Sequence, residues 1–172
     1  SDRAEPTIWV FKMERVNRIL QHPQYRECIR RNEEMERGRR FCTHGWDHLL
    51  DVARLAWIMA LEERLEAEKE IVYAAALLHD CGRYKQYEDG TPHEEAGARI
   101  APGILEECGF VYQEREKIRD AILSHRSVSV AAEKSLRGIL YRADKRSRRC
   151  FSCPVREECD WPEEKKNLKL CW

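Results

Sequence analysis

The sequence has no long hydrophobic run and no excess of charge of either sign. Its longest apolar segment, residues 71–78, is far shorter than the roughly 20 residues that cross a bilayer. Lys and Arg number 31, as do Asp and Glu, so no global field draws the chain to nucleic acid or to a membrane. No signal peptide is recognisable either. We therefore expect no membrane partner and a cytoplasmic location.

The sequence also has no glycine-rich phosphate loop, no internal repeat and almost no pattern typical of strands. These absences argue against a nucleotide-binding P-loop fold and against a repeat architecture. Apolar residues recur instead at helical spacing, and 36% of the residues are charged, which is typical of helices with solvated outer faces. The predicted fold class is all-α, a helical bundle.

The helical periods and their Gly or Pro boundaries define the expected elements. Helices are predicted over residues 9–20, 25–37, 45–64 and 71–78, from His93 to before Gly109, and over 113–125 and 130–146. A loop is expected at Gly90-Thr91-Pro92, at the end of the polar segment 84–92. The charged run 32–40 is expected to be a solvated face followed by a turn.

The eight cysteines are unevenly distributed. Cys28, Cys42, Cys81 and Cys108 stand singly, and the other four lie near the C-terminus. A chain of this size does not need a disulfide scaffold, so the pattern indicates a reducing compartment and a local metal site. We divide the chain into a helical domain, residues 1–149 with its core at about 41–149, and a Cys-rich tail, residues 150–172.

Two adjacent polar side chains, His79 and Asp80, end the apolar segment 71–78. Polar groups at the end of a buried helix are costly unless something pairs with them, and a divalent cation would pair with both. Imidazole and carboxylate together suit the harder and intermediate divalent metals. The pair is therefore a candidate metal-binding site.

Further candidate ligands lie on both sides of this pair: His44 and His48 upstream, and His93, His125 and Asp144 downstream. Each has an ordinary alternative. A histidine on an apolar helix face is usually a core residue, His125 could cap a helix, and Asp144 could pair with a nearby cation. That so many candidates follow one another in this order is much harder to attribute to chance than any one of them.

The order of these residues resembles the His, His-Asp, Asp metal signature of the HD superfamily of metal-dependent phosphohydrolases, an all-helical family. The resemblance covers residues 41–149 and rests on His48 with Val52 and Ala53, on residues 74–83, and on residues 143–145. Residues 93–98 and 121–125 resemble the two extra histidine positions of subfamilies with a two-metal centre.

The resemblance implies a ligand set. A first metal would be held by His48, His79, Asp80 and Asp144, and Asp80 would bridge to a second metal held by His93 and His125. The expected cofactors are one or two divalent ions among Mn, Fe, Zn, Ni, Co and Mg. Such a pair can stabilise the attacking and leaving oxygens of a phosphoester and activate water, with Asp80 as the catalytic carboxylate.

Three cations near these ligands could bind substrate phosphate: Arg83, Lys85 and Lys145. The alternative for each is an ordinary surface cation. His44 is placed outside the ligand set, where it would orient a ligand or bind substrate.

The resemblance implies hydrolysis of a phosphate ester or anhydride, with a small phosphate-containing substrate such as a nucleotide or dinucleoside polyphosphate. A non-catalytic metal- or nucleotide-binding protein stays open as an alternative. So does a nucleic-acid-associated module that uses the basic residues of segment 142–149 beside the tail. A homo-oligomer is compatible with either.

The tail contains a second candidate metal site. Cys150, Cys153 and Cys159 follow the pattern C-x2-C-P-x4-C, and Cys171 is expected to supply a fourth thiolate. Four thiolates usually hold structural zinc, but the run also resembles part of the iron–sulfur loop of endonuclease III-type DNA glycosylases. That loop has a further cysteine separated from its first by six residues, where Ala143 stands here. Zinc, an iron–sulfur cluster and metal-free thiols all stay open.

Overall fold

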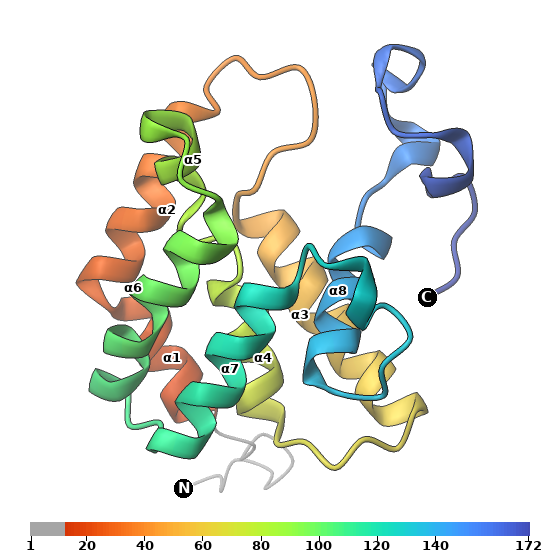
Figure 1. Ribbon diagram of the computed structural model, residues 1–172. Helices are drawn as coiled ribbons and strands as arrows, with labels where there is room; N and C mark the ends of the chain where they lie inside the picture. The colour runs from red at the N-terminus through yellow and green to blue at the C-terminus, as the bar shows by residue number, and fades with distance from the viewer. Residues whose placement is uncertain (1–12) are drawn as a thin grey trace, which may run out of the picture.

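The structure is a computed structural model that describes residues 13–172, so Trp9 and Val10 of the first predicted helix lie outside the described residues. The described part forms α-helices and short 3-10 turns without a strand, which confirms the predicted all-α fold (Figure 1). None of its helices is both long and apolar enough to cross a bilayer. The helices are α1 (Glu14–Gln21), α2 (Pro23–Met35), α3 (Trp46–Glu62), α4 (Lys69–Leu78), α5 (Arg83–Asp89), α6 (His93–Glu107), α7 (Tyr112–Ser124) and α8 (Leu136–Arg146).

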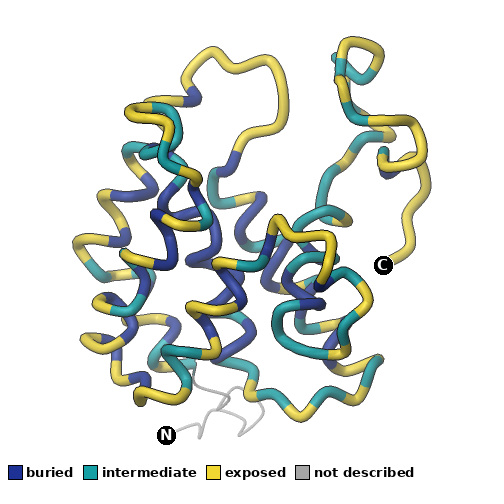
Figure 2. The backbone as a smooth tube through the Cα atoms, in the orientation of Figure 1, coloured by how far each residue is buried: buried dark blue, intermediate teal, exposed yellow. Residues whose placement is uncertain are grey.

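Helix α4 is the central element of the bundle. It packs against α1, α3, α7 and α8, and its residues 74–78 are fully buried. Three consecutive alanines in this segment let the neighbouring helices approach closely. Figure 2 shows the buried faces of the helices turned toward one another. Because His79 and Asp80 follow α4 directly, they lie in the interior of the protein.

The turn after α4 is pressed against helix α6. A Cβ atom on Gly82 would lie 2.4 Å from the backbone nitrogen of Gly97, which is closer than any side chain allows. Only glycine therefore fits at position 82. This contact fixes the His79–Asp80 turn relative to α6, the helix that begins with His93.

The polar segment 84–92 is mostly helical, since α5 covers Arg83–Asp89, and the predicted loop at Gly90-Thr91-Pro92 follows it. No helix-breaking residue stands between Gly82 and Gly90, and Gly90 ends the helix in the left-handed conformation (φ 78°). Tyr84 anchors the helix by its burial, with the Arg31 guanidinium 4.1 Å from its ring centroid. This helix was not predicted, because a short helix on the surface needs few apolar residues.

The last helix begins later than predicted, at Leu136 rather than near Val130. Ser135 is its N-cap, and its hydroxyl accepts a hydrogen bond from the backbone N–H of Gly138 at 3.2 Å. Before it, a 3-10 turn covers Val128–Val130. The Arg142 guanidinium donates to two backbone carbonyls of the segment between turn and helix, which holds that segment in a non-helical path.

Two segments project at the same end of the bundle (Figure 1): the loop that joins α2 to α3, and the C-terminal tail after α8. The tail contains the 3-10 turns η3 (Cys150–Ser152), η4 (Arg156–Glu158) and η5 (Glu163–Lys165). Within residues 150–172, Asn167 alone is buried. Its side-chain amide donates to the carbonyls of Lys145 and Arg148, at 2.7 and 3.0 Å, and so ties the tail to the end of α8.

Candidate metal centre

The fold brings six predicted ligands together at one end of the bundle. His48 lies in α3, His93 begins α6 and Asp144 lies in α8, while His79-Asp80 and His125 follow the ends of α4 and α7. All except Asp144 are buried, and His79 is fully so. Residues far apart in the sequence therefore converge on one interior point.

Four of these residues form a first group whose ligand atoms lie within 4.8 Å of one another: His48, His79, Asp80 and Asp144. Nε2 of His48 lies 3.4 Å from Oδ2 of Asp80 and 3.2 Å from Oδ1 of Asp144. Nε2 of His79 lies 3.0 Å and 3.5 Å from the same two oxygens. Two imidazole nitrogens and two carboxylate oxygens thus face one point.

Asp80 belongs also to a second group, with His93 and His125. Its other oxygen, Oδ1, lies 3.3 Å from Nε2 of His93 and 3.8 Å from Nε2 of His125. The two histidine nitrogens are 3.0 Å apart. The Asp80 carboxylate therefore divides its oxygens between two groups of ligand atoms, as a bridging ligand would.

Each of the four histidines turns Nε2 toward the centre because its Nδ1 is engaged elsewhere. Nδ1 of His79 and His125 lies 2.6 Å from the carbonyl oxygens of Ala76 and Ile122, and Nδ1 of His93 lies 2.6 Å from Oε1 of Gln86. Nδ1 of His48 lies 3.2 Å from the Ser147 hydroxyl. In a neutral imidazole, an acceptor at Nδ1 places the ring proton there and leaves Nε2 as the atom that can act as a ligand, as metal-binding histidines require.

The residues suit a divalent cation because two of their buried polar atoms have no hydrogen-bond partner. Nε2 of His79 and Oδ2 of Asp80 are buried, and neither makes a hydrogen bond. Buried polar atoms without a partner are rare in proteins because their desolvation is costly. Nitrogen and carboxylate donors are also the ligands that intermediate divalent metals prefer. The described clusters could therefore hold a metal ion.

The electrostatics of the site point the same way. Burial would raise the pKa of the Asp80 and Asp144 carboxyls, but the neighbouring histidines outweigh it and hold both pKa values well below their usual range. Burial lowers the pKa of His93 to about 2 and that of His125 to about 4. Burial lowers that of His79 too, but the two carboxylates outweigh it and raise its pKa to about 10. The site therefore attracts positive charge, which a metal would supply in place of the His79 proton.

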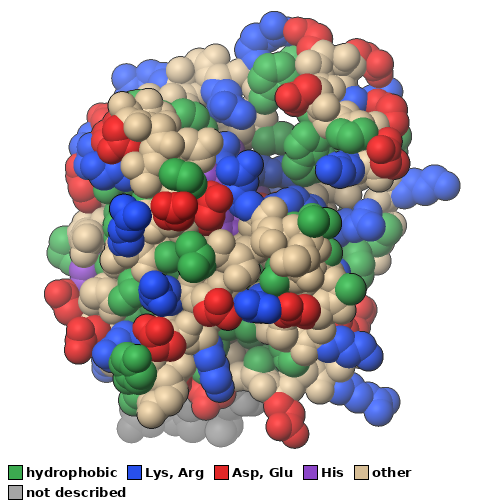
Figure 3. Space-filling model, viewed as in Figure 1, with side chains coloured by type: hydrophobic (Ala, Val, Ile, Leu, Met, Phe, Trp, Pro, Cys, Tyr) green, Lys and Arg blue, Asp and Glu red, His purple; other side chains and the backbone are tan. Residues whose placement is uncertain are grey.

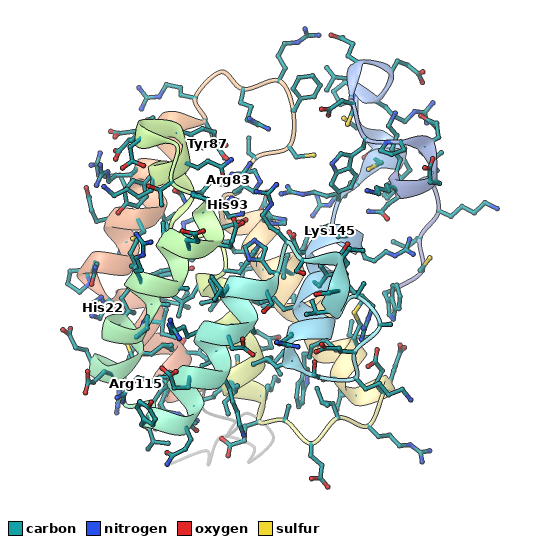
Figure 4. The ribbon with its side chains drawn as sticks, in the orientation of Figure 1. His22, Arg83, Tyr87, His93, Arg115 and Lys145 are labelled. Atoms are coloured by element: carbon teal, nitrogen blue, oxygen red, sulfur yellow. The ribbon has the colours of Figure 1, made fainter. Side chains whose placement is uncertain are left out.

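Three of the four predicted substrate-binding residues lie beside the ligands, and the fourth does not. Arg83 lies 3.2 Å from the His93 ring, and the Lys145 ammonium lies 2.5 Å from Oδ2 of Asp144. Figure 4 shows Arg83 beside His93, with Lys145 on α8 across from them. His44 packs edge-on against His48. Lys85, by contrast, faces Glu88 and Asp89 on the surface of α5, because the helix turns it away from the centre.

Two buried residues, Asn32 in α2 and its C-cap Glu36, support the site. They are exceptions to the predicted solvated face and turn of residues 32–40, whose other residues are exposed. The Asn32 amide donates to the Asp80 carbonyl (2.9 Å) and accepts from the Tyr84 N–H (2.7 Å). Glu36 pairs with Nδ1 of His44 and accepts from the Tyr87 hydroxyl at 2.9 Å. Their spacing in the sequence could have indicated this burial, because both continue the helix face that is buried at Cys28 and Ile29.

A cavity of about 960 Å³ opens above the ligands. Its floor includes His48, Asp80, His93, His125 and Asp144. Its walls come from the α2–α3 loop, α3, α5, α8, the residues that follow α7 and α8, and the tail. They carry four carboxylates besides the floor ligands (Asp47, Asp51, Glu158 and Asp160) and more cations: Arg39, Arg40, Arg83, Arg126, Lys145, Arg148, Arg149, Arg156 and Lys166. Figure 3 shows Lys and Arg side chains around a hollow in which histidine is visible. The cavity is thus suited to an anion.

The basic residues of segment 142–149 do not form one open surface. Arg142 pairs with Glu63 at 2.5 Å, Arg149 pairs with Asp51 at 2.7 Å, and Arg148 points to the His48 ring at 3.3 Å. The cluster that the sequence placed side by side is therefore divided between ion pairs and the cavity. This arrangement gives little support to a nucleic-acid module.

The tail cysteines are not gathered as predicted. Cys150, Cys153 and Cys159 line the large cavity, where Cys42 of the α2–α3 loop joins them. Cys171 lines a separate cavity of about 280 Å³ beside α3 and Trp172. The final segment of the chain runs back along α3, where the Trp172 indole donates to Glu62 at 2.8 Å, and this carries Cys171 away from the others.

Comparison with known proteins agrees with this architecture. The HD domain family matches residues 45–149. An uncharacterized protein of Clostridium beijerinckii is 44% identical over 158 residues, which span 92% of this chain and 99% of the relative. The crystal structure of a predicted HD superfamily hydrolase from an uncultured Thermotogales bacterium superposes with a TM-score of 0.57 and 28% identity, over 89% of this chain and 87% of that one. The chain belongs to the HD domain family.

Proposed function

We propose that this protein is a metal-dependent phosphohydrolase that cleaves a phosphate ester or anhydride. The observation that carries the proposal is the Asp80 carboxylate, which faces His48 and His79 with one oxygen and His93 and His125 with the other. This arrangement lies at the floor of a cavity walled by cations. The hydrolase named in the structural comparison supports the same reaction class.

Two divalent ions fit the ligand groups, one with His48, His79, Asp80 and Asp144, the other with Asp80, His93 and His125. Bound divalent ions supply Lewis-acid stabilisation of phosphoryl oxygens and lower the pKa of bound water. The protein holds the ligands in place through the acceptors at each Nδ1 and through Asn32, which bonds the Asp80 backbone. This preorganisation keeps the geometry fixed during the reaction.

The cations of the cavity wall bind the phosphate groups of the substrate. Arg83 and Lys145 lie beside the ligands themselves, and Arg148 reaches His48 from the tail. A guanidinium matches the oxygens of a phosphate in geometry and charge, so Arg83 and Arg148 are the strongest anchors. The His44 ring, fixed by Glu36, orients the phosphate at the cavity floor.

The substrate that we propose is a nucleotide or a dinucleoside polyphosphate. The cavity is large for a single phosphate group, and cations continue from its floor to its rim. Phe41 and Trp161 also line it and offer aromatic surface to a base. A substrate with several phosphates and an aromatic ring would use both features.

A substrate panel tests this function. Protein stripped of metal and reloaded with Mn²⁺, Fe²⁺, Co²⁺, Ni²⁺, Zn²⁺ or Mg²⁺ is assayed with nucleoside mono-, di- and triphosphates, dinucleoside polyphosphates, phosphodiesters and simple phosphomonoesters. We expect metal-dependent phosphate release with at least one nucleotide class. Metal-loaded protein that binds nucleotides but turns over none of these compounds would contradict the proposal and favour a non-catalytic binding protein.

Substitution of Arg83 tests the phosphate anchors. Arg83→Gln removes a cation of the cavity wall, and hydrogen bonds to charged groups contribute about 1.5–3 kcal/mol. We expect kcat/KM to fall roughly 10- to 150-fold. Lys85→Gln is the matched control, because Lys85 lies on the same helix and faces Glu88 instead of the cavity. Equal effects of the two substitutions, or a loss of bound metal in Arg83→Gln, would refute a role of Arg83 as a phosphate anchor.

A further inference from the structure

We propose that Cys42, Cys150, Cys153 and Cys159 hold a second metal centre, which clamps the C-terminal tail to the α2–α3 loop and closes one wall of the cavity. Three of these thiols stand close together in the tail, whereas Cys42 precedes them by more than a hundred residues. All four line the same cavity. The centre would be distinct from the His/Asp ligands at the cavity floor.

The chain segments that carry these thiols are bonded to each other on both sides of Cys42. Two residues before Cys42, the Arg40 guanidinium pairs with Glu158 at 2.6 Å, and Glu158 directly precedes Cys159. One residue after Cys42, the Thr43 carbonyl accepts from the guanidinium of Arg148 at 2.7 Å, two residues before Cys150. These two contacts hold the loop around Cys42 beside the segments that carry the other three thiols.

The pKa of the Cys42 thiol is shifted by the same neighbouring residues. Burial is the main cause that raises its pKa, and Cys150, Cys153 and Cys159 raise it further, while Arg148 acts in the opposite direction. The Cys42 thiol therefore lies within electrostatic reach of these three tail thiols.

The tail lacks an apolar core that could hold it in one conformation. Residues 150–172 bury the side chain of Asn167 and no apolar side chain, and their regular structure consists of 3-10 turns. Phe151, a large apolar residue of this segment, is 51% exposed. A segment without an apolar core gains its order from other bonds, and metal ligation supplies free energy of folding directly.

Two kinds of metal centre suit four thiolates, and they differ in the distance between the sulfurs. In a tetrahedral zinc site with Zn–S bonds of about 2.3 Å, all sulfurs lie about 3.8 Å apart. In the described residues, the groups of three or more ligand atoms mutually within 4.8 Å are the two His/Asp groups, and the thiols form no such group. An iron–sulfur cluster spreads its four thiolates over several metal atoms and so holds them farther apart. The chemistry common to both is tetrathiolate ligation of a thiophilic metal.

Metal analysis of cysteine variants tests the ligand set. The full-length protein, purified without oxygen, is analysed for iron, zinc and acid-labile sulfide per chain, together with its visible spectrum and far-UV circular dichroism. We expect Cys42→Ser to lose the thiolate-held metal and to keep the metal of the His/Asp site. Cys171→Ser is the matched control and should keep both. Iron with sulfide identifies a cluster, and zinc without sulfide identifies a single ion at the same ligands.

Two results would overturn the proposal: unchanged metal content in Cys42→Ser, or loss of the thiolate-held metal in Cys171→Ser while Cys42→Ser retains it. A measurement on the unsubstituted protein covers the case in which Cys42→Ser does not fold. Alkylation mapped by mass spectrometry should find Cys42, Cys150, Cys153 and Cys159 protected together, then labelled together once a chelator removes the metal. Cys171 should be labelled throughout. Labelling of Cys42 before metal removal, or protection that persists after it, contradicts metal ligation.

Discussion

Replacing Asp80 by alanine is expected to abolish turnover and to release the metal of the His/Asp site. Asp80 is the one residue that belongs to both ligand groups, so a single substitution removes an oxygen ligand from each. The metal ions are expected to supply several kcal/mol of transition-state stabilisation, so the loss in kcat/KM should be roughly 10³-fold or more. The measurement is phosphate release together with metal content per chain.

Asp47→Ala provides the control for this experiment. Asp47 lies in the same helix as His48 and lines the same cavity, yet it belongs to neither ligand group. Its substitution should leave the bound metal of the His/Asp site unchanged and cost little activity. Circular dichroism should show that both variants keep their helices, because α4 is buried by its apolar residues and not by Asp80. Full activity in Asp80→Ala would refute the assignment of the site.

The Asp80→Ala variant also tests whether the His/Asp site and the thiolate centre bind metal independently. Asp80→Ala should leave the metal at the cysteines in place, since these thiols lie on the wall of the cavity and not among the His/Asp ligands. Cys42→Ser should do the reverse and keep the His/Asp metal. A protein that loses both metals in either variant would have one interdependent site, contrary to the separation that the geometry supports.

The residues that converge on one interior point could be predicted because the signal was local and ordered. His79 and Asp80 are adjacent at the end of an apolar helix, and a helix end buried by apolar residues must place them in the interior. The structure brings all six predicted ligands together, and their binding of metal stays a prediction. The helices themselves followed from apolar periodicity, since their core-facing residues recur at helical spacing.

The sequence could not predict the features that depend on distant contacts. Gln86 fixes the His93 ring from a helix that was not predicted. Cys42 looked like an isolated thiol, because its neighbours in space lie more than a hundred residues away. Cys171 was grouped with the other tail cysteines because it is near them in sequence, whereas the final segment leads it toward α3. Proximity along a chain is a poor guide where there is no regular structure.

The second large effect concerns the turn that carries His79 and Asp80. Gly82→Ala is expected to destabilise the fold by about 3 kcal/mol or more, because overpacking a close contact forces the backbone to move. Its Cβ would lie 2.4 Å from the nitrogen of Gly97 and 2.8 Å from the carbonyl carbon of Ala96. Both are backbone atoms of α6, which cannot rotate away as a side chain can. Thermal and urea unfolding measure the loss.

Gly103→Ala is the matched control on the same helix. No atom lies within 4 Å of the Cβ that this substitution would add, and the residue lies inside α6. Alanine is the better helix former there, so we expect a gain in stability of roughly 0.5–1 kcal/mol. Opposite signs at the two glycines would separate the effect of close approach from that of helix propensity. If Gly82→Ala were as stable as the unsubstituted protein, the turn would not be pressed against α6, and the position of Asp80 relative to His93 would need another explanation.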